Sequence, residues 1–189
     1  MVHEQHALVH DAQRCLKKSE VCPWQFRAHP DMINAQSIRA GGINMRNGKA
    51  VLVSGSSKGI GRGIVLAFAK AGYDVAVHYS TSKADAEQVC RLAQAHGVRA
   101  CLVQGDTADS TVPERMVREA VEKLGRLDVF VANAGFFAKE SLTQMSTELM
   151  DNLYRVNFRG MVLGAQAAAQ YYLQEKIAGC ILINTSVRA

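Results

Sequence analysis

The stretch Ser54-Gly-Ser-Ser-Lys-Gly-Ile-Gly61 separates two different sequence patterns. It follows the short apolar run Lys49-Ala-Val-Leu-Val53. After it, apolar residues recur at helical spacing, at Ile60, Ile64, Phe68 and Ala71. A short apolar run, a glycine-rich turn and a 3.6-residue period together predict a strand, a turn and a helix.

In such a strand-turn-helix unit, each of the three glycines is needed for a different physical reason. Gly55 allows the tight turn, Gly59 lets the backbone approach a pyrophosphate, and Gly61 lets the helix pack closely on the sheet. The exposed amides and the positive end of the helix dipole then hold phosphate groups. The stretch predicts a dinucleotide-binding loop. The plain alternative is a glycine-rich turn without a ligand.

The rest of the chain repeats the alternation of strand and helix. Apolar runs predict strands at 74–79, 98–104, 127–132 and 181–184, and helical periodicity predicts helices over 83–96, 110–124 and 147–176. Strands that are apolar throughout indicate a parallel sheet covered on both faces. The sequence therefore predicts a doubly wound, Rossmann-type α/β domain over residues 48–189 that binds NAD(P) and is incomplete at its C-terminus.

Residues 1–47 differ from this domain. They hold four of the six histidines, the only tryptophan and no sustained periodicity. We expect a flexible, poorly structured N-terminal extension. His3, His6 and His10 share a helical spacing and are a candidate metal site, but no carboxylate or cysteine completes it. We therefore predict no metal.

Charge and cysteine usage exclude several classes of protein. The net charge of +5 is spread thinly, with no block of Lys/Arg, so we predict no nucleic-acid partner. No apolar run reaches the roughly 18 residues of a membrane span, and the first residues lack the basic-then-apolar pattern of a signal peptide, so we expect a protein that is not secreted. The five cysteines form no C-x-x-C pair, which argues against a zinc or dithiol site. Their odd number and mostly apolar neighbours indicate reduced thiols, so we expect a cytoplasmic location.

The glycine spacing, G-x-x-x-G-x-G, resembles that of the short-chain dehydrogenase/reductase family, in which Thr is usual where this chain has Ser54. Further motifs match in order. Asp106 matches the family aspartate that contacts the adenine, and Asn133-Ala-Gly135 matches the segment that steadies the central sheet. Asn157 matches the asparagine of the catalytic tetrad, and a gapless alignment puts the catalytic serine at Ser186. The resemblance covers residues 49–189.

The resemblance implies a set of site residues, although Asn133, Asn157 and Ser186 each have an ordinary structural explanation when taken singly. The implied catalytic residues are Ser186 and Asn157. The implied cofactor-binding residues are Gly55, Ser57, Lys58, Gly59, Ile60, Gly61, Tyr79, Ser80, Asp106, Thr107, Asn133, Ala134 and Gly135. Within the family, the chain is most similar to 3-oxoacyl-carrier-protein reductases and sugar or polyol dehydrogenases. This resemblance implies a small carbonyl or alcohol substrate. It also implies that full-length relatives form homo-oligomers.

The end of the second strand predicts which nicotinamide cofactor is bound. A site specific for NAD has an Asp or Glu there to hold the ribose 2′-hydroxyl, whereas a 2′-phosphate needs a cation instead. Tyr79 and Ser80 occupy this place, with Lys58 in the glycine turn and Lys83 soon after. Nothing at the strand end is expected to repel a 2′-phosphate, so the sequence favours NADP over NAD.

The pair Tyr172-x-x-x-Lys176 has the spacing of the family's catalytic tyrosine and lysine. It precedes Ser186, however, whereas the family pair follows the serine. Tyr172 also lies fifteen residues beyond Asn157 on one predicted helix, or about 22 Å away, and is expected at the opposite edge of the sheet.

The family's tyrosine and lysine are therefore expected beyond residue 189. The leading hypothesis is an NADP-dependent oxidoreductase that moves a hydride between the nicotinamide and a carbonyl or secondary alcohol. The alternative is a catalytically inactive dinucleotide-binding or interaction module. A chain that stops here is also expected to leave its last strand as an exposed apolar edge.

Overall fold

The computed structural model of the protein describes residues 48–185. The elements of this span are β1 (Ala50–Val53), α2 (Gly59–Lys70), β2 (Asp74–Tyr79), α3 (Lys83–Gln94), β3 (Ala100–Gln104), α4 (Val112–Leu124), β4 (Val129–Ala132), α5 (Thr147–Tyr154), the π-helical segment η2 (Arg155–Gly160), α6 (Met161–Glu175) and β5 (Cys180–Ile183). This is the predicted order of elements. The predictions for the N-terminal extension and for Ser186 lie outside the described residues.

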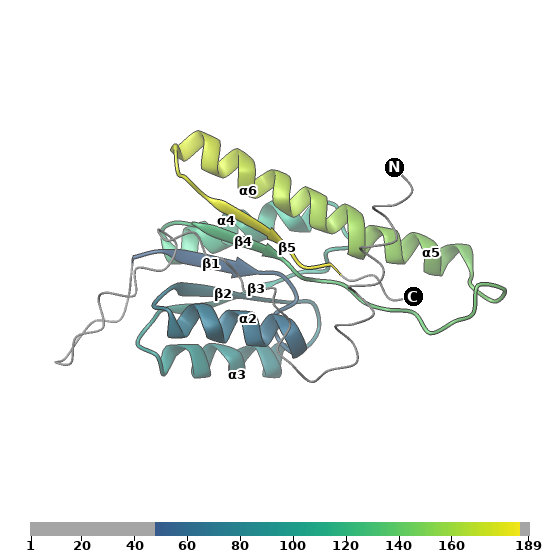
Figure 1. Ribbon diagram of the computed structural model, residues 1–189, viewed down its shortest axis with the longest axis horizontal. Coiled ribbons are helices and arrows are strands. Elements are labelled where there is room, and N and C mark those ends of the chain that lie inside the picture. The colour runs from purple at the N-terminus through teal and green to yellow at the C-terminus, as the bar shows by residue number, and fades with distance from the viewer. Residues whose placement is uncertain (1–47, 186–189) are drawn as a thin grey trace, which may run out of the picture. The chain divides into compact units, whose positions relative to one another are not determined.

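The strands form one parallel sheet in the order β3-β2-β1-β4-β5 (Figure 1). β1 is central, and it pairs with β2 on one side and with β4 on the other. The chain therefore winds outward in one direction through β3 and then returns to the other side of β1. In such sheets a ligand binds at the carboxyl ends of the strands, where the winding direction reverses. Here that place is the edge formed by the segments after β1 and β4.

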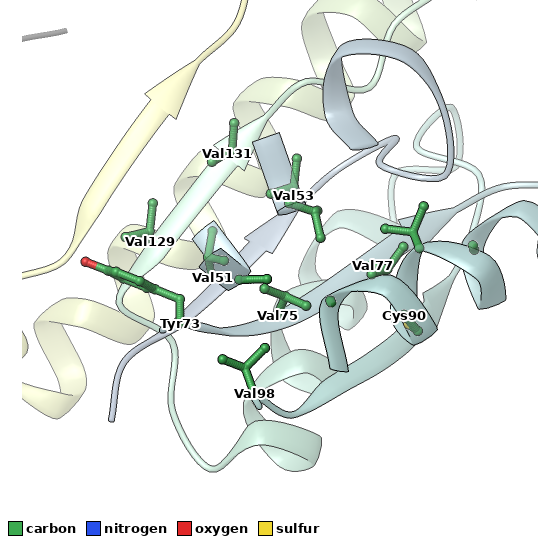
Figure 2. Packing of buried hydrophobic residues seen from close by; sticks show 14 of the residues in the cluster. Val51, Val53, Tyr73, Val75, Val77, Cys90, Val98, Val129 and Val131 are labelled. Carbon is green, nitrogen blue, oxygen red and sulfur yellow. The ribbon is translucent and has the colours of Figure 1, made fainter. Parts of the chain in front are cut away.

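Side chains alternate between the two faces of the sheet and make two cores. Helices α2 and α3 cover one face, and α4 and α6 cover the other (Figure 1). Val51 and Val53 point toward α2 and α3, whereas Leu52 points toward α4 and α6. Figure 2 shows the first core, in which valines of β1, β2 and β4 converge with Cys90 of α3. Both faces are buried, which explains why the strands are apolar throughout.

The residues of α2 that are buried against the sheet are not the apolar residues whose spacing predicted the helix. Its buried residues are Gly61, Val65 and Ala69, while Ile64 and Phe68 are only partly buried. Ile60 is 70% exposed. The helix rests on the sheet through its small residues, because Gly61 brings its first turn directly against the glycine turn. Ile60 is thereby left at the surface, beside the predicted phosphate loop.

The predicted long helix is present, but it is not uniform. α5, η2 and α6 follow one another without a break from Thr147 to Glu175, and six residues in the middle have π-helical hydrogen bonding. Asn157 lies within these six residues. Insertions of this kind are often found at functional sites.

Strand β5 is an edge of the described sheet, as predicted. It pairs only with β4, and its last residue, Ile183, is 52% exposed. Within residues 48–185, no helix is both long and apolar enough to cross a membrane, and no three metal-binding side chains cluster.

Candidate functional site

The glycine turn after β1 is tightly packed on one side and open on the other. Gly55 has a φ of 62°, and a β-carbon on it would lie 2.9 Å from Ala134 Cα. A β-carbon on Gly61 would lie 2.5 Å from the Gly55 carbonyl oxygen. Gly59 also has a positive φ, of 55°, but a β-carbon there would meet no atom within 4 Å. Gly55 and Gly61 are thus needed for packing, and Gly59 keeps open a surface that a ligand can approach.

The first turn of α2 begins at this open surface. Lys58 is the N-cap residue, and its side chain makes no capping hydrogen bond. The first amides of a helix have no partner within the helix, and they carry the positive end of its dipole. The turn therefore presents hydrogen-bond donors and partial positive charge, which is the requirement for binding a phosphate.

Ser54 joins the glycine turn to the segment after β4. Its hydroxyl oxygen accepts hydrogen bonds from the Asn133 amide at 2.8 Å and the Ala134 amide at 2.9 Å. The hydroxyl itself donates to the Val131 carbonyl at 3.4 Å. The Ser54 side chain is buried, and its bonds to the two amides are partly buried. Threonine would offer the same hydroxyl, which explains why Ser can stand where the family usually has Thr.

Asn133 extends the same connection across three strands. Its Nδ2 donates to the carbonyls of Ser54 at 2.9 Å and Gly55 at 3.2 Å. Its Oδ1 accepts from Asn184 Nδ2, after β5, at 2.8 Å. One amide side chain thus ties together the carboxyl ends of β1, β4 and β5, and this contact pattern fits a role in steadying the sheet.

Asn157 reaches the same edge from the π-helical segment. Its Oδ1 accepts from the Phe136 amide at 2.9 Å, and its Nδ2 donates to the Phe136 carbonyl at 2.8 Å. A β-carbon on Gly135 would lie 3.1 Å from Asn157 Oδ1, so glycine gives this contact its room. The structure therefore brings Asn157 against the segment that begins at Asn133, and its catalytic role stays a prediction.

A third loop, which follows β3, lies at the same carboxyl edge of the sheet. Asp106 is exposed, and its Oδ1 accepts from the Ala108 amide at 2.9 Å, so it caps its own turn. Thr107 is buried, and a β-carbon on Gly160 of η2 would lie 2.6 Å from its carbonyl oxygen. Arg159 of η2 donates to the Ala108 carbonyl. The π-helical segment thus contacts both the loop at Asp106 and the segment after β4.

The two residues predicted at the end of β2 differ in what they present. Tyr79 is only 4% exposed and packs into the core against α3. Its side chain therefore gives no support to the predicted contact with a cofactor, and that role stays a prediction. Ser80 is exposed, and its carbonyl accepts from Gln104 Nε2 at 3.5 Å.

Lys58 and Lys83, the two lysines near the end of β2, each lie beside a carboxylate. Lys58 Nζ lies 3.1 Å from Asp85 Oδ2, and Lys83 Nζ lies 3.9 Å from Glu87 Oε1. The first pair forms because the first turn of α3 lies beside the glycine turn, and the second joins residues one turn apart within α3. Both lysines are exposed, so these ion pairs are weak and a stronger anion can replace the carboxylates.

His78 was not among the predicted site residues, but it lies in β2 and makes a hydrogen bond to the glycine turn. Its Nδ1 accepts a hydrogen bond from the Gly55 amide at 2.9 Å, and its side chain is 2% exposed. The only signal in the sequence is a single histidine in the otherwise apolar end of a strand, Val75-Ala-Val-His-Tyr79. The contact itself spans 23 residues and depends on the register of β1 and β2.

Tyr172 lies at the opposite edge of the sheet, as its position on the helix predicts. Its hydroxyl donates to the carbonyl of Cys180, the first residue of β5, at 3.3 Å. Burial, with smaller contributions from Cys180 and Asp128, raises the pKa of Tyr172 above its usual value. A tyrosine acting as a proton donor near neutral pH needs a lowered pKa instead. Lys176 is exposed and ends α6 in a left-handed conformation, with a φ of 55°.

Comparison with known proteins agrees with this geometry. The sequence profile of the short chain dehydrogenase family matches residues 49–189. An L-rhamnose 1-dehydrogenase (NAD(P)(+)) of Sphingomonas sp. is 35% identical over 78% of this chain and 58% of its own length. The 3-oxoacyl-[acyl-carrier-protein] reductase FabG of Staphylococcus aureus is 36% identical over 77% of this chain and 59% of its own.

Solved structures give the same result. A short chain dehydrogenase from Burkholderia cenocepacia in complex with NADP has a TM-score of 0.65 and 36% identity, over 68% of this chain and 52% of its own. The acetoin dehydrogenase YohF of Salmonella typhimurium has a TM-score of 0.70 and 29% identity, over 74% and 58%. The chain thus spans less than 60% of the length of these four relatives. From residue 49 onward, the chain belongs to the short-chain dehydrogenase family.

Proposed function

We propose that this chain binds NADP(H) and is part of an oxidoreductase that interconverts a carbonyl and a secondary alcohol. The observation that carries the proposal is the asymmetry of the glycine turn. Neighbouring atoms pack against Gly55 and Gly61, whereas Gly59 faces open space. Gly59 also begins a helix whose N-cap side chain makes no capping hydrogen bond. Family membership and a solved relative in complex with NADP support the same assignment.

The residues present fit a dinucleotide. The glycine turn and the first turn of α2 supply main-chain donors for the phosphates. Lys58 lies beside this turn and supplies a positive charge for a 2′-phosphate, and Ser80 adds a hydroxyl at the end of β2. In the same proposal Asp106 and Thr107, which follow β3, contact the adenine. Asn133, Ala134 and Gly135 continue the same edge toward Asn157.

When bound, the reduced nicotinamide supplies a hydride to the carbonyl carbon and is oxidised, while the carbonyl oxygen takes up a proton and becomes a hydroxyl. Asn157 supports this step by holding the main chain of Phe136 at the carboxyl edge of β4. In the same proposal Ser186 orients the substrate oxygen, and the substrate is a small sugar-like or acyl ketone or alcohol. Homo-oligomeric assembly also belongs to the proposal. It is supported by exposed apolar side chains at four-residue spacing, namely Met150, Tyr154, Phe158 and Val162.

A second candidate function is a dinucleotide-binding module without turnover. The observation that favours it is the place of Tyr172 and Lys176, at the edge of the sheet away from the glycine turn. NADPH oxidation with a panel of ketones, measured beside NADP⁺ binding by calorimetry, separates the two functions. Binding with turnover supports the oxidoreductase, and binding without turnover supports the module.

Tyr172→Phe is expected to leave NADP⁺ affinity and any ketone reduction by this chain unchanged. The variant removes one long hydrogen bond to Cys180, so the free energy of unfolding should fall by about 1 kcal/mol or less. Denaturant unfolding and cofactor titration check both statements. Loss of turnover with unchanged stability would show that Tyr172 is the catalytic acid and that its placement here is not the active one.

Lys58→Ala is expected to weaken NADP⁺ binding about fivefold and to leave NAD⁺ binding nearly unchanged. The lysine is exposed, so its charge contributes only about 1 kcal/mol to holding a 2′-phosphate. Asp85→Asn should have the opposite effect, because it frees Lys58 and removes an anion beside the phosphate.

Lys70→Ala is the matched control for the Lys58 substitution, since this lysine is exposed in the last turn of the same helix. It should change neither affinity. Equal losses of NADP⁺ and NAD⁺ binding in Lys58→Ala would argue against recognition of the 2′-phosphate by this lysine. Absence of any dinucleotide binding by the unmodified chain would overturn the proposed function itself.

A further inference from the structure

We propose that His78 is a positioning residue for the cofactor. Its neutral imidazole accepts a hydrogen bond from the Gly55 amide and thereby holds the glycine turn in the orientation that binds the pyrophosphate. This proposal rests on the proposed function for the identity of the ligand. His78 itself does not touch the ligand surface, because its side chain is buried.

The geometry begins where the pairing of β1 with β2 stops. The last aligned pair of the two strands is Val53 with Val77, so the chain beyond Val53 leaves the sheet. The Gly55 amide is partly buried here and needs an acceptor other than a neighbouring strand. His78 Nδ1 supplies it, at 2.9 Å from the Gly55 nitrogen.

Ser56 adds a second connection between the same two segments. Its amide donates to the His78 carbonyl at 2.8 Å, and its hydroxyl oxygen accepts from the His78 amide at 3.0 Å. The hydroxyl donates in turn to the Val53 carbonyl at 2.7 Å. Gly55 and Ser56 are therefore both held from β2, and the direction of the chain entering Ser57 is set by His78.

This arrangement divides the amides of the turn into two groups. The amides of Gly55 and Ser56 point into the protein, where His78 takes both of them. The amides that follow, at the start of α2, are left for the ligand. Loss of the acceptor at His78 would leave the partly buried amide of Gly55 without a partner, and the turn would rotate to hydrate it.

The hydrogen bond also determines the state of the imidazole. Nδ1 must carry a lone pair to accept from Gly55, so the ring proton is on Nε2. Within residues 48–185, Nε2 is buried and makes no hydrogen bond. The nearby charged groups are Arg115 and Glu119 of α4 and Asp106 of the loop after β3.

The environment keeps the ring neutral. Burial lowers the pKa of His78 to about 4, with Arg115 acting in the same direction and the Gly105 main chain, Asp106 and Glu119 opposing it. The ring is therefore uncharged at neutral pH, where its Nδ1 is available as an acceptor. A histidine that worked as a proton donor in catalysis would need a pKa near the working pH instead.

The test compares a substitution that keeps an acceptor at this position with one that removes it. His78→Asn places an amide oxygen, attached like Nδ1 to Cγ, where it can accept from Gly55. His78→Leu has a similar volume and no acceptor. At pH 7.5 we expect NADP⁺ affinity within threefold of the unmodified chain for His78→Asn, and a loss of tenfold or more for His78→Leu.

Adenosine 2′-monophosphate is the control ligand, because it carries the 2′-phosphate and adenine but no pyrophosphate. Its affinity should be the same in the unmodified chain and both variants. Equal NADP⁺ affinity in His78→Leu and the unmodified chain overturns the role of His78 alone. An unmodified chain that binds no NADP⁺ overturns both this role and the proposed function.

A measurement on the unmodified chain covers the case in which His78→Leu fails to fold. Nitrogen-15 NMR of the imidazole should show the tautomer with its proton on Nε2, unchanged between pH 7.5 and pH 5.5. A proton on Nδ1, or a charged ring in this range, would overturn the proposal, because neither form can accept a hydrogen bond from Gly55 at Nδ1.

Discussion

Gly61→Ala is expected to abolish NADP⁺ binding and to lower the free energy of unfolding by about 3 kcal/mol. A β-carbon at this position would lie 2.5 Å from both Asn133 Nδ2 and the Gly55 carbonyl oxygen, and 2.9 Å from Ser56 Cα. These atoms belong mainly to backbone, which cannot move aside as a flexible side chain can. Overpacking of this kind costs about 1–3 kcal/mol. The glycine turn must shift, and its amides then no longer converge on the phosphates.

Gly63→Ala is the matched control for Gly61→Ala. It lies two residues further along the same helix, and a β-carbon there would meet no atom within 4 Å. Alanine is the better helix former, so this variant should be as stable as the unmodified chain or up to about 1 kcal/mol more stable. Thermal unfolding and NADP⁺ titration of both variants check the prediction. Similar behaviour of the two would show that close packing at Gly61 is not what the turn requires.

Ser54→Ala is expected to lower the free energy of unfolding by about 2–4 kcal/mol. The hydroxyl oxygen is the acceptor for the amides of both Asn133 and Ala134, and the site is buried. A buried donor left without an acceptor costs about 1–3 kcal/mol. Here two partly buried donors lose their acceptor at once, at the point where the glycine turn meets the segment after β4. Cofactor affinity should fall as well, because both loops contribute to the same edge.

Ser54→Thr should restore most of what the alanine variant loses, since it keeps the hydroxyl. Denaturant unfolding of the three chains measures the order of stability, with Ser and Thr similar and Ala well below. If Ser54→Ala were as stable as the unmodified chain, the two amides would have found another acceptor. The hydroxyl would then not be what joins the two segments.

The order of strands and helices could be predicted because each element has a local signal. The inward face of α3 followed from its period, and the buried residues are Ala86, Val89, Cys90 and Ala93, as such a period requires. The face of α2 did not follow, because small residues at Gly61 and Ala69 face the sheet in preference to Ile60. A hydrophobic pattern does not reveal where a helix and a sheet pack so closely that glycine and alanine are favoured between them.

The candidate site was predictable to the extent that its motifs lie at strand ends. Parallel strands share one carboxyl edge, so Gly55, Asn133 and Asp106 had to lie along the same side of the sheet. The same geometry put Tyr172 at the other edge. Charge pairing was not predictable in this way, and the ion pair of Lys58 with Asp85 joins two exposed side chains that lie 27 positions apart.

Local sequence was therefore sufficient for the Rossmann-type fold and for the glycine turn, because backbone freedom and hydrophobic period act over a few residues. The partners of that turn depend on folding of the whole sheet. Ser54 meets Asn133 across 79 positions, and Gly55 meets His78 across 23. Such contacts depend on strand register and on which buried donors lack an acceptor, and both are settled only when the strands lie side by side. The glycine motif predicts where a phosphate binds, and the packed sheet determines how the turn that binds it is held.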